Sequence, residues 1–329
     1  METSLDFTRW GEKPLGIGYR RWVIASTGLR QLLNTKFFRG LLLLAWSAGL
    51  MMAVAGFLFS QSISPGGWLE AMATRFGPRP QAVVSAFCAF VLLYPDIIVQ
   101  GLYTMIFWGH ASLGLGLSLV ALTSVVPRLV TRDRASNALT IYLARPLTSF
   151  DYLLGKFGII LGILLAVWTG PLLFGWLLSV LFAPDRVFII YSLVPLGRAL
   201  LFNLVGLIVL AAIALGVSSA TKTARNTIFL WIGIWIVAGT IANIPTTPTW
   251  VRHASFSYNL RQLRGEIFRP DDALAAAAKS LPLMDQHVTD NLGQASRALA
   301  TEGVTAPAGG LAVLVGLSCL VFFRRLRPE

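Results

Sequence analysis

Long apolar runs separated by short polar connections make up most of this chain. Six of the runs are almost free of charged residues. A helix needs roughly 20 predominantly apolar residues to cross the hydrocarbon core of a bilayer. The pattern therefore predicts six transmembrane helices, at Gly40–Phe59, Leu102–Pro127, Phe157–Phe182, Val187–Ala220, Thr227–Ile244 and Val304–Phe323.

A seventh apolar run is shorter. Ala82–Tyr94 is followed at once by Pro95 and Asp96, and a run of that length is typical of an interfacial or re-entrant piece rather than a span. The preceding stretch, Ser60–Pro80, is polar with Pro and Gly punctuation and predicts a loop. If Gln81–Tyr103 also crossed the membrane, every later span would be inverted.

Composition supports the membrane assignment. Apolar residues make up 55% of the 329 residues, charged residues only 13%, and the mean hydropathy is +0.69. A soluble domain usually carries about a quarter charged residues. The fold class predicted is therefore an all-α polytopic membrane protein. Cys88 and Cys319 both sit in apolar runs and are interpreted as small buried hydrophobes.

The N-terminal part has a different pattern. Residues 1–39 precede the first span and are too long and polar for the start of a cleavable signal, so the first span is expected to be a permanent anchor. Within them, Tyr19–Arg39 alternates basic and apolar residues, which favours an amphipathic helix lying in the membrane interface. The alternative is a juxtamembrane helix that covers a soluble partner.

The net charge of +12 is distributed unevenly among the connections. With the N-terminus inside, 17 of the 27 Lys and Arg residues fall on the cytoplasmic side. Cytoplasmic loops carry such an excess, so both termini are predicted to be cytoplasmic in a bacterial-type inner membrane. The basic character is then explained by this bias and by attraction to membrane lipid, and a nucleic-acid partner is excluded.

This orientation divides the chain into four parts. Residues 1–39 are the cytoplasmic lead-in and interfacial helix. Spans one to five occupy 40–244 and include a cytoplasmic segment at 128–156. Residues 245–308 form a long extracytoplasmic segment with an amphipathic stretch at Asp271–Leu281, which could fold as a cap or lie on the outer leaflet. Residues 309–329 are the last helix and a cytoplasmic tail.

The cytoplasmic segment predicts a short amphipathic helix. After the charged cluster Arg132-Asp133-Arg134, the residues Leu139, Tyr142 and Leu143 recur at helical spacing. Arg145-Pro146 ends this helix, because proline disfavours the helical conformation in the residue before it. Ser149 or Asp151 is expected to cap the next helix, which runs into the third span.

Several residues of this segment together resemble the permease subunits of ABC transporters of the ABC-2 type. In that family the stretch commonly reads Glu-Arg, a short gap, Gly-Thr-Leu, then Leu-Leu, Pro and Tyr-Leu-Leu-Gly-Lys. The chain departs from it at Asp133, where Glu is usual, and at Asn137-Ala138, where Gly is common. The matching residues are Arg132-Asp133-Arg134, Leu139-Thr140, Leu143, Arg145-Pro146 and Tyr152-Leu-Leu-Gly-Lys156. The six-span plan, the N-terminal interfacial helix and the long outer segment resemble the family across the chain.

The resemblance implies a coupling helix that inserts into a cleft of a separate ABC ATP-binding subunit. It also implies two permease copies, as a homodimer or with a similar permease, around an export path, with ATP and Mg²⁺ bound in the partner subunits. The residues that would carry the coupling are Arg132, Asp133, Arg134, Leu139, Tyr142, Leu143, Arg145 and Pro146. The alternative interpretation of the segment is a membrane-surface helix with no partner.

The sequence gives no sign of an enzyme. Its only Gly-Lys pair, Gly155-Lys156, has Phe150 where a phosphate-binding loop needs its first glycine, and no Ser or Thr follows the lysine. No catalytic residue, bound cofactor or metal is predicted. His287 is flanked by Asp285 and Asp290, but no third ligand follows at metal-binding spacing.

Small and polar residues within the spans complete the set of candidates. Small residues at every fourth position let helices approach closely, which predicts packing at Gly158 and Gly162 and at Ala212 and Gly216. Gly114 and Gly116 are candidates for packing or for a flexible point in the second span. Polar groups within spans are functional suspects. These are Arg198 and Asn203, candidates for a translocation path, and His110, for which a structural role is favoured.

Two other functions remain open from the sequence. A self-contained secondary transporter would need ionisable residues near the membrane midplane or repeated broken helices. A non-transporting membrane scaffold is suggested only by the long outer segment.

Overall fold

The chain forms helices joined by short connections, and the residues described contain no strand. The structure, a computed structural model, describes residues 16–64, 66–135, 148–244, 247–280, 291, 294 and 303–326. Six helices in these ranges are long and apolar enough to cross a membrane. This confirms the prediction of an all-α membrane protein with six spanning-length helices. They cover Lys36–Ile63, Ile98–Arg134, Phe150–Leu181, Arg186–Ala220, Ala224–Asn243 and Thr305–Arg325.

These helices are labelled α2 (Lys36–Ile63), α5 (Ile98–Leu129), α8 to α9 (Ser149–Leu181), α10 (Arg186–Ala220), α11 (Ala224–Asn243) and α16 (Thr305–Leu326). A helix bonds all its interior backbone groups within itself, which is what a segment surrounded by lipid requires. Charged residues accordingly collect at the ends, as Lys36 does in α2 and Arg324 and Arg325 do in α16.

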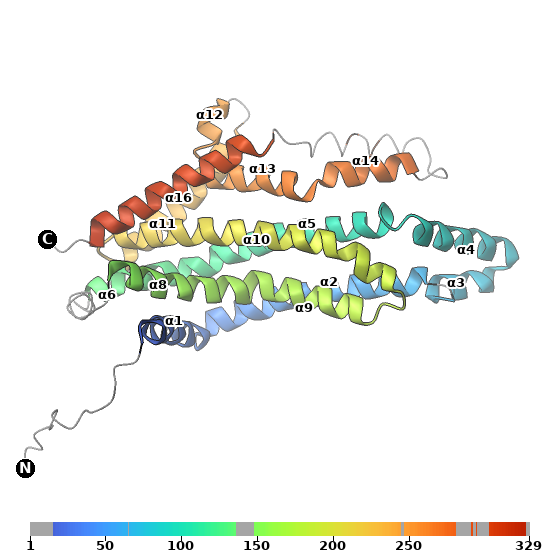
Figure 1. Cartoon of the computed structure of the whole chain (residues 1–329), viewed down its shortest axis with the longest axis horizontal. Coiled ribbons are helices and arrows are strands. Elements are labelled where there is room, and N and C mark those ends of the chain that lie inside the picture. Colours follow the sequence, from blue (N-terminus) through green and yellow to red (C-terminus); the bar gives the residue numbers. More distant parts are fainter. Residues whose placement is uncertain are drawn as a thin grey trace, which may run out of the picture.

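The spanning helices run side by side along the long axis of the molecule (Figure 1). α5 and α10 form the centre, because 56% and 67% of their most apolar windows are buried, against 17% for α16. α2 packs along α9, and α16 packs along α10. One end of this bundle holds α1, the short helix α6 (Thr131–Ala135) and the C-terminal end of α16, and we call it the α6 end.

The opposite end carries a helical hairpin, which corrects the predicted loop at Ser60–Pro80. α2 continues to Ile63, and α3 (Trp68–Ala73), a 3₁₀ turn (Thr74–Phe76) and α4 (Pro78–Leu93) follow. Gly77, with φ 107°, makes the sharp turn between them, and Pro78 suits the first turn of a helix because its missing N–H needs no partner there. We call this the hairpin end.

The hairpin also determines the direction of α5. α4 has 16 residues and falls below spanning length. α4 and α5 then run one after the other in the same direction, away from the hairpin end (Figure 1). The chain therefore reverses once between α2 and α5, which is what a short non-crossing piece at Ala82–Tyr94 requires.

The third spanning helix is interrupted, whereas the sequence predicted one continuous span. α8 (Ser149–Leu164) passes into a π turn, η3 (Leu165–Thr169), and then into α9 (Gly170–Leu181). The Gly170 N–H donates to the Leu165 carbonyl, five residues back. Pro171 explains the wide turn, because proline lacks an N–H and its ring crowds the carbonyl four residues before it.

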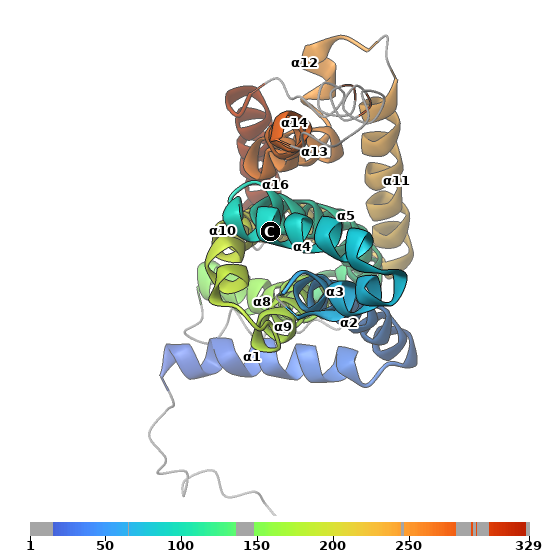
Figure 2. The same cartoon turned by 90° about the vertical axis from the view of Figure 1, so that its right-hand side faces the viewer.

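α1 (Ile17–Leu33) lies crosswise to the bundle at the α6 end (Figure 2). It packs on α8, where glycines replace side chains along the contact. A Cβ at Gly155 would lie 3.0 Å from Ile24, and one at Gly158 would lie 2.9 Å from Ala25. The outer surface of α1 exposes large apolar side chains such as Trp22, which is 66% exposed. This is the form expected of an interfacial helix.

The segment after α11 enters the bundle. It forms α12 (Thr249–Arg252), α13 (Phe256–Phe268) and α14 (Pro270–Ser280). α13 packs against α10, α11 and α16, and α14 packs against α5 (Figure 1). α13 is therefore neither a separate cap nor a helix on the outer leaflet, because its Leu260 and Phe268 are fully buried. Its polar residues fit there because Arg261 donates to the Ala242 carbonyl at the end of α11, 2.8 Å away.

Candidate functional site

The predicted coupling residues fall on both sides of the boundary of the described structure. Leu139, Tyr142, Leu143, Arg145 and Pro146 lie outside the described residues. The charged cluster that precedes them forms α6, and the residues after them begin with Thr148, directly before α8. The candidate site is therefore defined by how the connection from α6 to α8 is held at its two ends.

Arg134 ties α6 to the ends of two other helices. Its Nη1 donates to the Ser219 carbonyl at 3.0 Å, and its Nη2 donates to the Arg325 carbonyl at 3.0 Å. Both carbonyls lie in the last turn of a helix, α10 and α16 respectively. Carbonyls in the last turn have no partner within the helix and carry partial negative charge, so a guanidinium is a favourable donor there.

Hydroxyl groups fix the start of α6 to the end of α10. Thr131 Oγ1 donates to the Ser218 carbonyl at 2.9 Å, and Ser218 Oγ accepts from the Val130 N–H at 2.9 Å. Thr131 Oγ1 also lies 3.0 Å from Thr227 Oγ of α11. Thr131, Ser218 and Thr227 are buried, so these bonds form away from water, where leaving such groups unpaired is costly.

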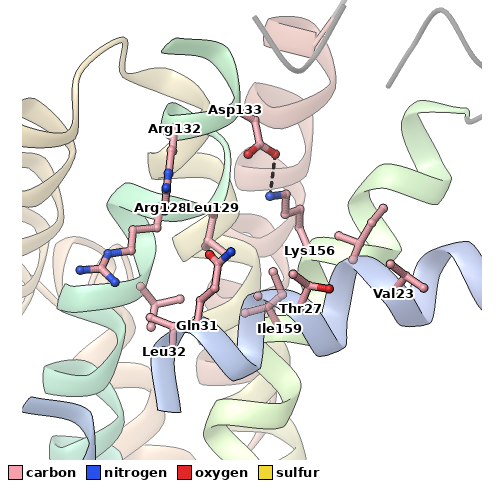
Figure 3. A pocket seen from close by; sticks show the side chains of 13 residues that line it. Val23, Thr27, Gln31, Leu32, Arg128, Leu129, Arg132, Asp133, Lys156 and Ile159 are labelled. Carbon is pink, nitrogen blue, oxygen red and sulfur yellow. Dashed lines mark ion pairs between the residues drawn. The ribbon is translucent and has the colours of Figure 1, made fainter. Parts of the chain in front are cut away.

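An ion pair joins α6 to α8 (Figure 3). Lys156 Nζ lies 2.6 Å from Asp133 Oδ2, and the Tyr152 hydroxyl donates to the same oxygen at 2.8 Å. Tyr152 and Lys156 are four residues apart and so share one face of α8. The side chains of Lys156 and Asp133 are only 8% and 17% exposed. Residues of the motif before and after the connection are thus brought together.

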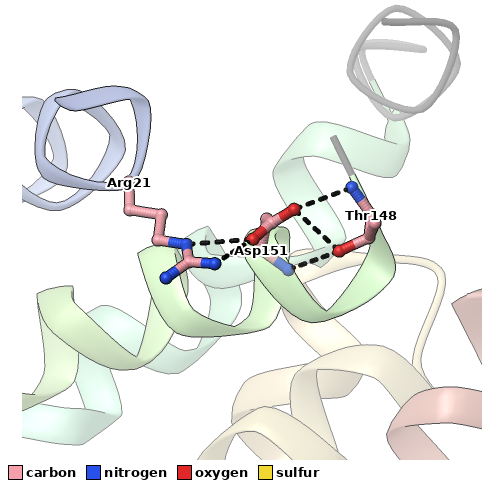
Figure 4. Close-up of polar contacts among 3 residues, drawn as sticks. All are labelled: Arg21, Thr148 and Asp151. Carbon is pink, nitrogen blue, oxygen red and sulfur yellow. Dashed lines mark hydrogen bonds and ion pairs between the residues drawn. The ribbon is translucent and has the colours of Figure 1, made fainter. Parts of the chain in front are cut away.

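A second set of contacts holds the start of α8 (Figure 4). The N-cap is Thr148, which corrects the prediction of Ser149 or Asp151. Thr148 Oγ1 accepts from the Asp151 N–H at 3.2 Å, and the Asp151 carboxylate accepts from the Thr148 N–H at 3.1 Å. Asp151 also accepts from Arg21 Nε of α1 at 2.9 Å and forms an ion pair with that guanidinium. The cap therefore links α8 to α1.

The two candidate path residues face different neighbours. Arg198 Nη1 donates to the Phe268 carbonyl at the end of α13, 3.0 Å away. Asn203 is buried, and its Nδ2 donates to Thr169 Oγ1 of the π turn at 3.3 Å. Five residues along a helix correspond to about 140° around its axis, so the two side chains are not on one face. His110, in α5, is a separate group whose Nδ1 has no hydrogen-bond partner among the described residues.

The small residues lie at contacts between helices of the same chain. A Cβ at Gly162 would lie 3.2 Å from Leu29 of α1, beside the Gly158 contact with Ala25. A Cβ at Gly216 would lie 3.1 Å from Ser318 of α16, and Ala212 is one turn earlier in α10. The helices approach closely at these positions because no side chain stands between them.

Sequence reasoning missed three features of the site. The Thr148–Asp151 pair fits the Thr-x-x-Asp form of a capping box, and that spacing could have found it. Arg21 could not have been paired with Asp151, because the contact depends on the crosswise placement of α1. Trp168 was also missed; its ring fits between α5 and α10, where a Cβ at Gly114 or Gly206 would lie 2.0 or 2.6 Å from it.

No metal-binding group emerges from the described ranges, which contain no cluster of three or more His, Cys, Asp or Glu residues. His253 Nδ1 lies 2.8 Å from the Asn259 amide oxygen, an ordinary structural contact. His287 and its two flanking aspartates lie outside the described residues.

The fold and the site define a class, that of polytopic α-helical membrane proteins. Comparison of the sequence with models of known protein families and with curated proteins gives no match. A more specific assignment therefore rests on the residues and contacts of the chain itself.

Proposed function

We propose that this chain is the membrane-spanning subunit of an ATP-driven exporter that resembles ABC transporters of the ABC-2 type. Residues 136–147 and their flanks would bind a separate ATP-binding subunit. The observation that carries the proposal is the Asp133–Lys156 ion pair, 2.6 Å long, which closes the base of the connection with two residues of the motif. Both termini and the α6 end would face the cytoplasm, as the distribution of Lys and Arg favours.

The contacts at the two flanks support a mechanical role. Arg134 reaches the ends of α10 and α16, Asp133 is bound to α8, and Asp151 is bound to α1. A displacement of the connection is therefore passed to the ends of several helices at once, through contiguous polar contacts. α10 is the most buried of the spanning helices, so movement at its end acts on the centre of the bundle.

Two copies of this subunit would form the export path, with ATP and Mg²⁺ held by the partner subunits. Binding of ATP would draw the two connections together, and hydrolysis would release them. The interrupted helix α8–η3–α9 is suited to such a cycle, because π turns are frequent at functional sites of helices and leave a local break in the regular hydrogen bonding.

The test is co-purification of the ATP-binding subunit from native membranes. Leu139→Asp together with Leu143→Asp should abolish binding, because two charges would enter an apolar contact. The matched control is Met72→Asp with Phe76→Asp, which changes two apolar residues at the same spacing that are exposed at the hairpin end. Retention of the ATPase by the Leu139/Leu143 variant, or its absence from the unmodified complex, would contradict the proposal.

The broken third helix also suits a self-contained secondary transporter, in which broken helices line the substrate site. Uptake driven by an ion gradient in vesicles that contain this chain alone distinguishes the two functions. ATP-dependent transport requires the partner, whereas gradient-driven transport does not.

A further inference from the structure

A pocket of about 430 Å³ lies between α1, the end of α5 and the start of α8 (Figure 3). Thr27 and Gln31 of α1 line one side, and Arg128 and Arg132 line the other. The pocket is adjacent to the candidate site, because the Asp133–Lys156 ion pair forms part of its wall. The contacts between helices described above leave this space unfilled.

The wall of the pocket is positively charged. Arg128 in the last turn of α5 and Arg132 in α6 both line the pocket. Among the described residues that line the pocket, the only carboxylate is that of Asp133, which is 2.6 Å from Lys156. The described lining thus holds three cations, Arg128, Arg132 and Lys156, against one carboxylate, and this composition favours an anionic ligand.

The remaining wall is apolar and is supplied by three helices. It consists of Val23, Ile24, Leu32, Val125, Leu129 and Ile159. A free inorganic anion gains nothing from such a surface, because burial against apolar groups favours only apolar matter. A ligand that matches both walls is an amphiphile with an anionic head and a hydrocarbon part.

α1 places this pocket at the level of lipid headgroups. Its surface away from the bundle exposes Tyr19 and Trp22, 52% and 66% exposed, and side chains of this kind are enriched at membrane interfaces. An amphipathic helix of this kind lies between headgroups and acyl chains. Basic pockets between helices on the cytoplasmic side are the type of site that binds anionic lipid headgroups.

We propose that this pocket binds one anionic glycerophospholipid of the inner leaflet. Its phosphate would lie at Arg128 and Arg132, and the first part of its acyl chains would lie on the apolar wall. The bound lipid fills the space between α1 and α5 and so holds α1 in its crosswise position. This inference rests on the orientation in the proposed function but not on the ATP-binding partner.

The test is lipid retention by the purified chain, measured by native mass spectrometry in detergent with added phosphatidylglycerol or phosphatidylcholine. The unmodified chain should retain phosphatidylglycerol in preference to phosphatidylcholine. Arg128→Gln and Arg132→Gln should each weaken retention about fivefold, which is the contribution of one cation near an anionic lipid surface. The matched control, Arg75→Gln with Arg79→Gln, removes two exposed arginines from the hairpin end and should leave retention unchanged.

A second variant keeps every charge. Thr27→Trp places a large side chain into the opening from an exposed position of α1, and it should lower phosphatidylglycerol retention at least as strongly as Arg128→Gln or Arg132→Gln. Equal retention by the unmodified chain and these variants would overturn the proposal. Displacement of the lipid by millimolar glycerol phosphate would also overturn it, because it would show that the pocket recognises a soluble anion.

Because the measurement uses the chain alone, it is independent of the ATPase. Loss of the ATPase interaction with normal lipid retention would contradict only the proposed function. Loss of lipid selectivity with normal ATPase binding would contradict only this inference.

Discussion

Lys156 is a cation with little access to water, and its place in the structure depends on Asp133 and Tyr152. Burying an ion pair is costly, but removing one partner is worse, since the other charge is left in a poorly solvated site. The pair therefore fixes α6 against α8 more firmly than an exposed pair could.

We expect Lys156→Met to destabilise the chain by up to about 3–5 kcal/mol, the cost of breaking a buried pair. The measurement is thermal unfolding in detergent. Adding Asp133→Asn should recover most of the loss, because the uncompensated charge is removed. Asp272→Asn is the control, since its pair with Arg269 is more than half exposed and 3.8 Å long, and exposed pairs contribute about 0–1 kcal/mol. Equal losses of stability in Lys156→Met and Asp272→Asn would show that burial does not strengthen the Asp133–Lys156 pair.

Two glycines of α5 provide a second comparison. A Cβ at Gly114 would lie 2.0 Å from the fully buried Trp168 ring, whereas nothing lies within 4 Å of one at Gly116. We expect Gly114→Ala to cost about 1–3 kcal/mol by overpacking. Gly116→Ala should be neutral or stabilising by roughly 0.5–1 kcal/mol, because alanine is the better helix former. Unfolding midpoints of the two variants in the same detergent test this. A stabilised Gly114→Ala together with a destabilised Gly116→Ala would contradict the packing of Trp168 against Gly114.

For single residues, the sequence pattern singled out members of the motif but not the contacts that they make. The pattern around residues 127–156 led to Asp133 and Lys156, although their contact could not be inferred from spacing. The bond of Arg21 to Asp151 lay beyond sequence reasoning, because the two residues are 130 positions apart and meet only when α1 lies across α8.

Among the helical elements, the α3–α4 hairpin depends on one carboxylate. Glu70 accepts from the Ser85 hydroxyl at 2.5 Å and from the Gly66 N–H at 2.9 Å. Donation from Ser85, and then from Gly66, lowers the pKa of Glu70 below its ordinary value. A group with a lowered pKa stabilises the folded hairpin above its unfolded pKa, and the contribution is lost as the pH falls through the folded pKa.

Hydrogen exchange of α3 and α4 amides should therefore quicken as the pH is lowered below the ordinary pKa of a glutamate, after correction for the intrinsic pH dependence. Glu70→Gln should exchange faster at neutral pH and lose this dependence. The helices at the α6 end serve as the internal reference. A Glu70→Gln hairpin with the original pH response would show that another group titrates.

The apolar helices lie where the apolar runs predicted them, but the polar helix α13 was not predicted. α13 was missed as a bundle helix because it carries Arg261 and Arg264, which a hydropathy pattern assigns to water. Its cations are placed by tertiary contacts: Arg264 lies over the Trp108 ring, 4.4 Å from its centre, and Arg261 bonds to the end of α11. A guanidinium that stacks on an aromatic ring can be buried at modest cost.

For the whole molecule, the alternation of the helices predicts which loops share a side of the membrane. In a variant with Cys88 and Cys319 replaced by alanine, single cysteines at Arg79 and Ala183 should react with an impermeant thiol reagent from outside the cell. Cysteines at Asn34 and Lys222 should react only after permeabilisation. Labelling of Arg79 and Ala183 from opposite sides would show that α4 crosses the membrane.

The π turn between α8 and α9 has a consequence for how the sequence can change. A π turn contains one residue more than the α-helical path would, so it behaves like a one-residue insertion held in place ahead of Pro171. Removing one residue there, such as Ala166, would restore a regular helix whose two halves keep nearly the same orientation, because the wide turn already absorbs the extra residue. Gly175, whose space is taken by Met52 and Gly49 of α2, would keep its contact. The ring of Pro171 would instead crowd the carbonyl four residues before it, so we expect related chains to tolerate the deletion only where this proline is also replaced.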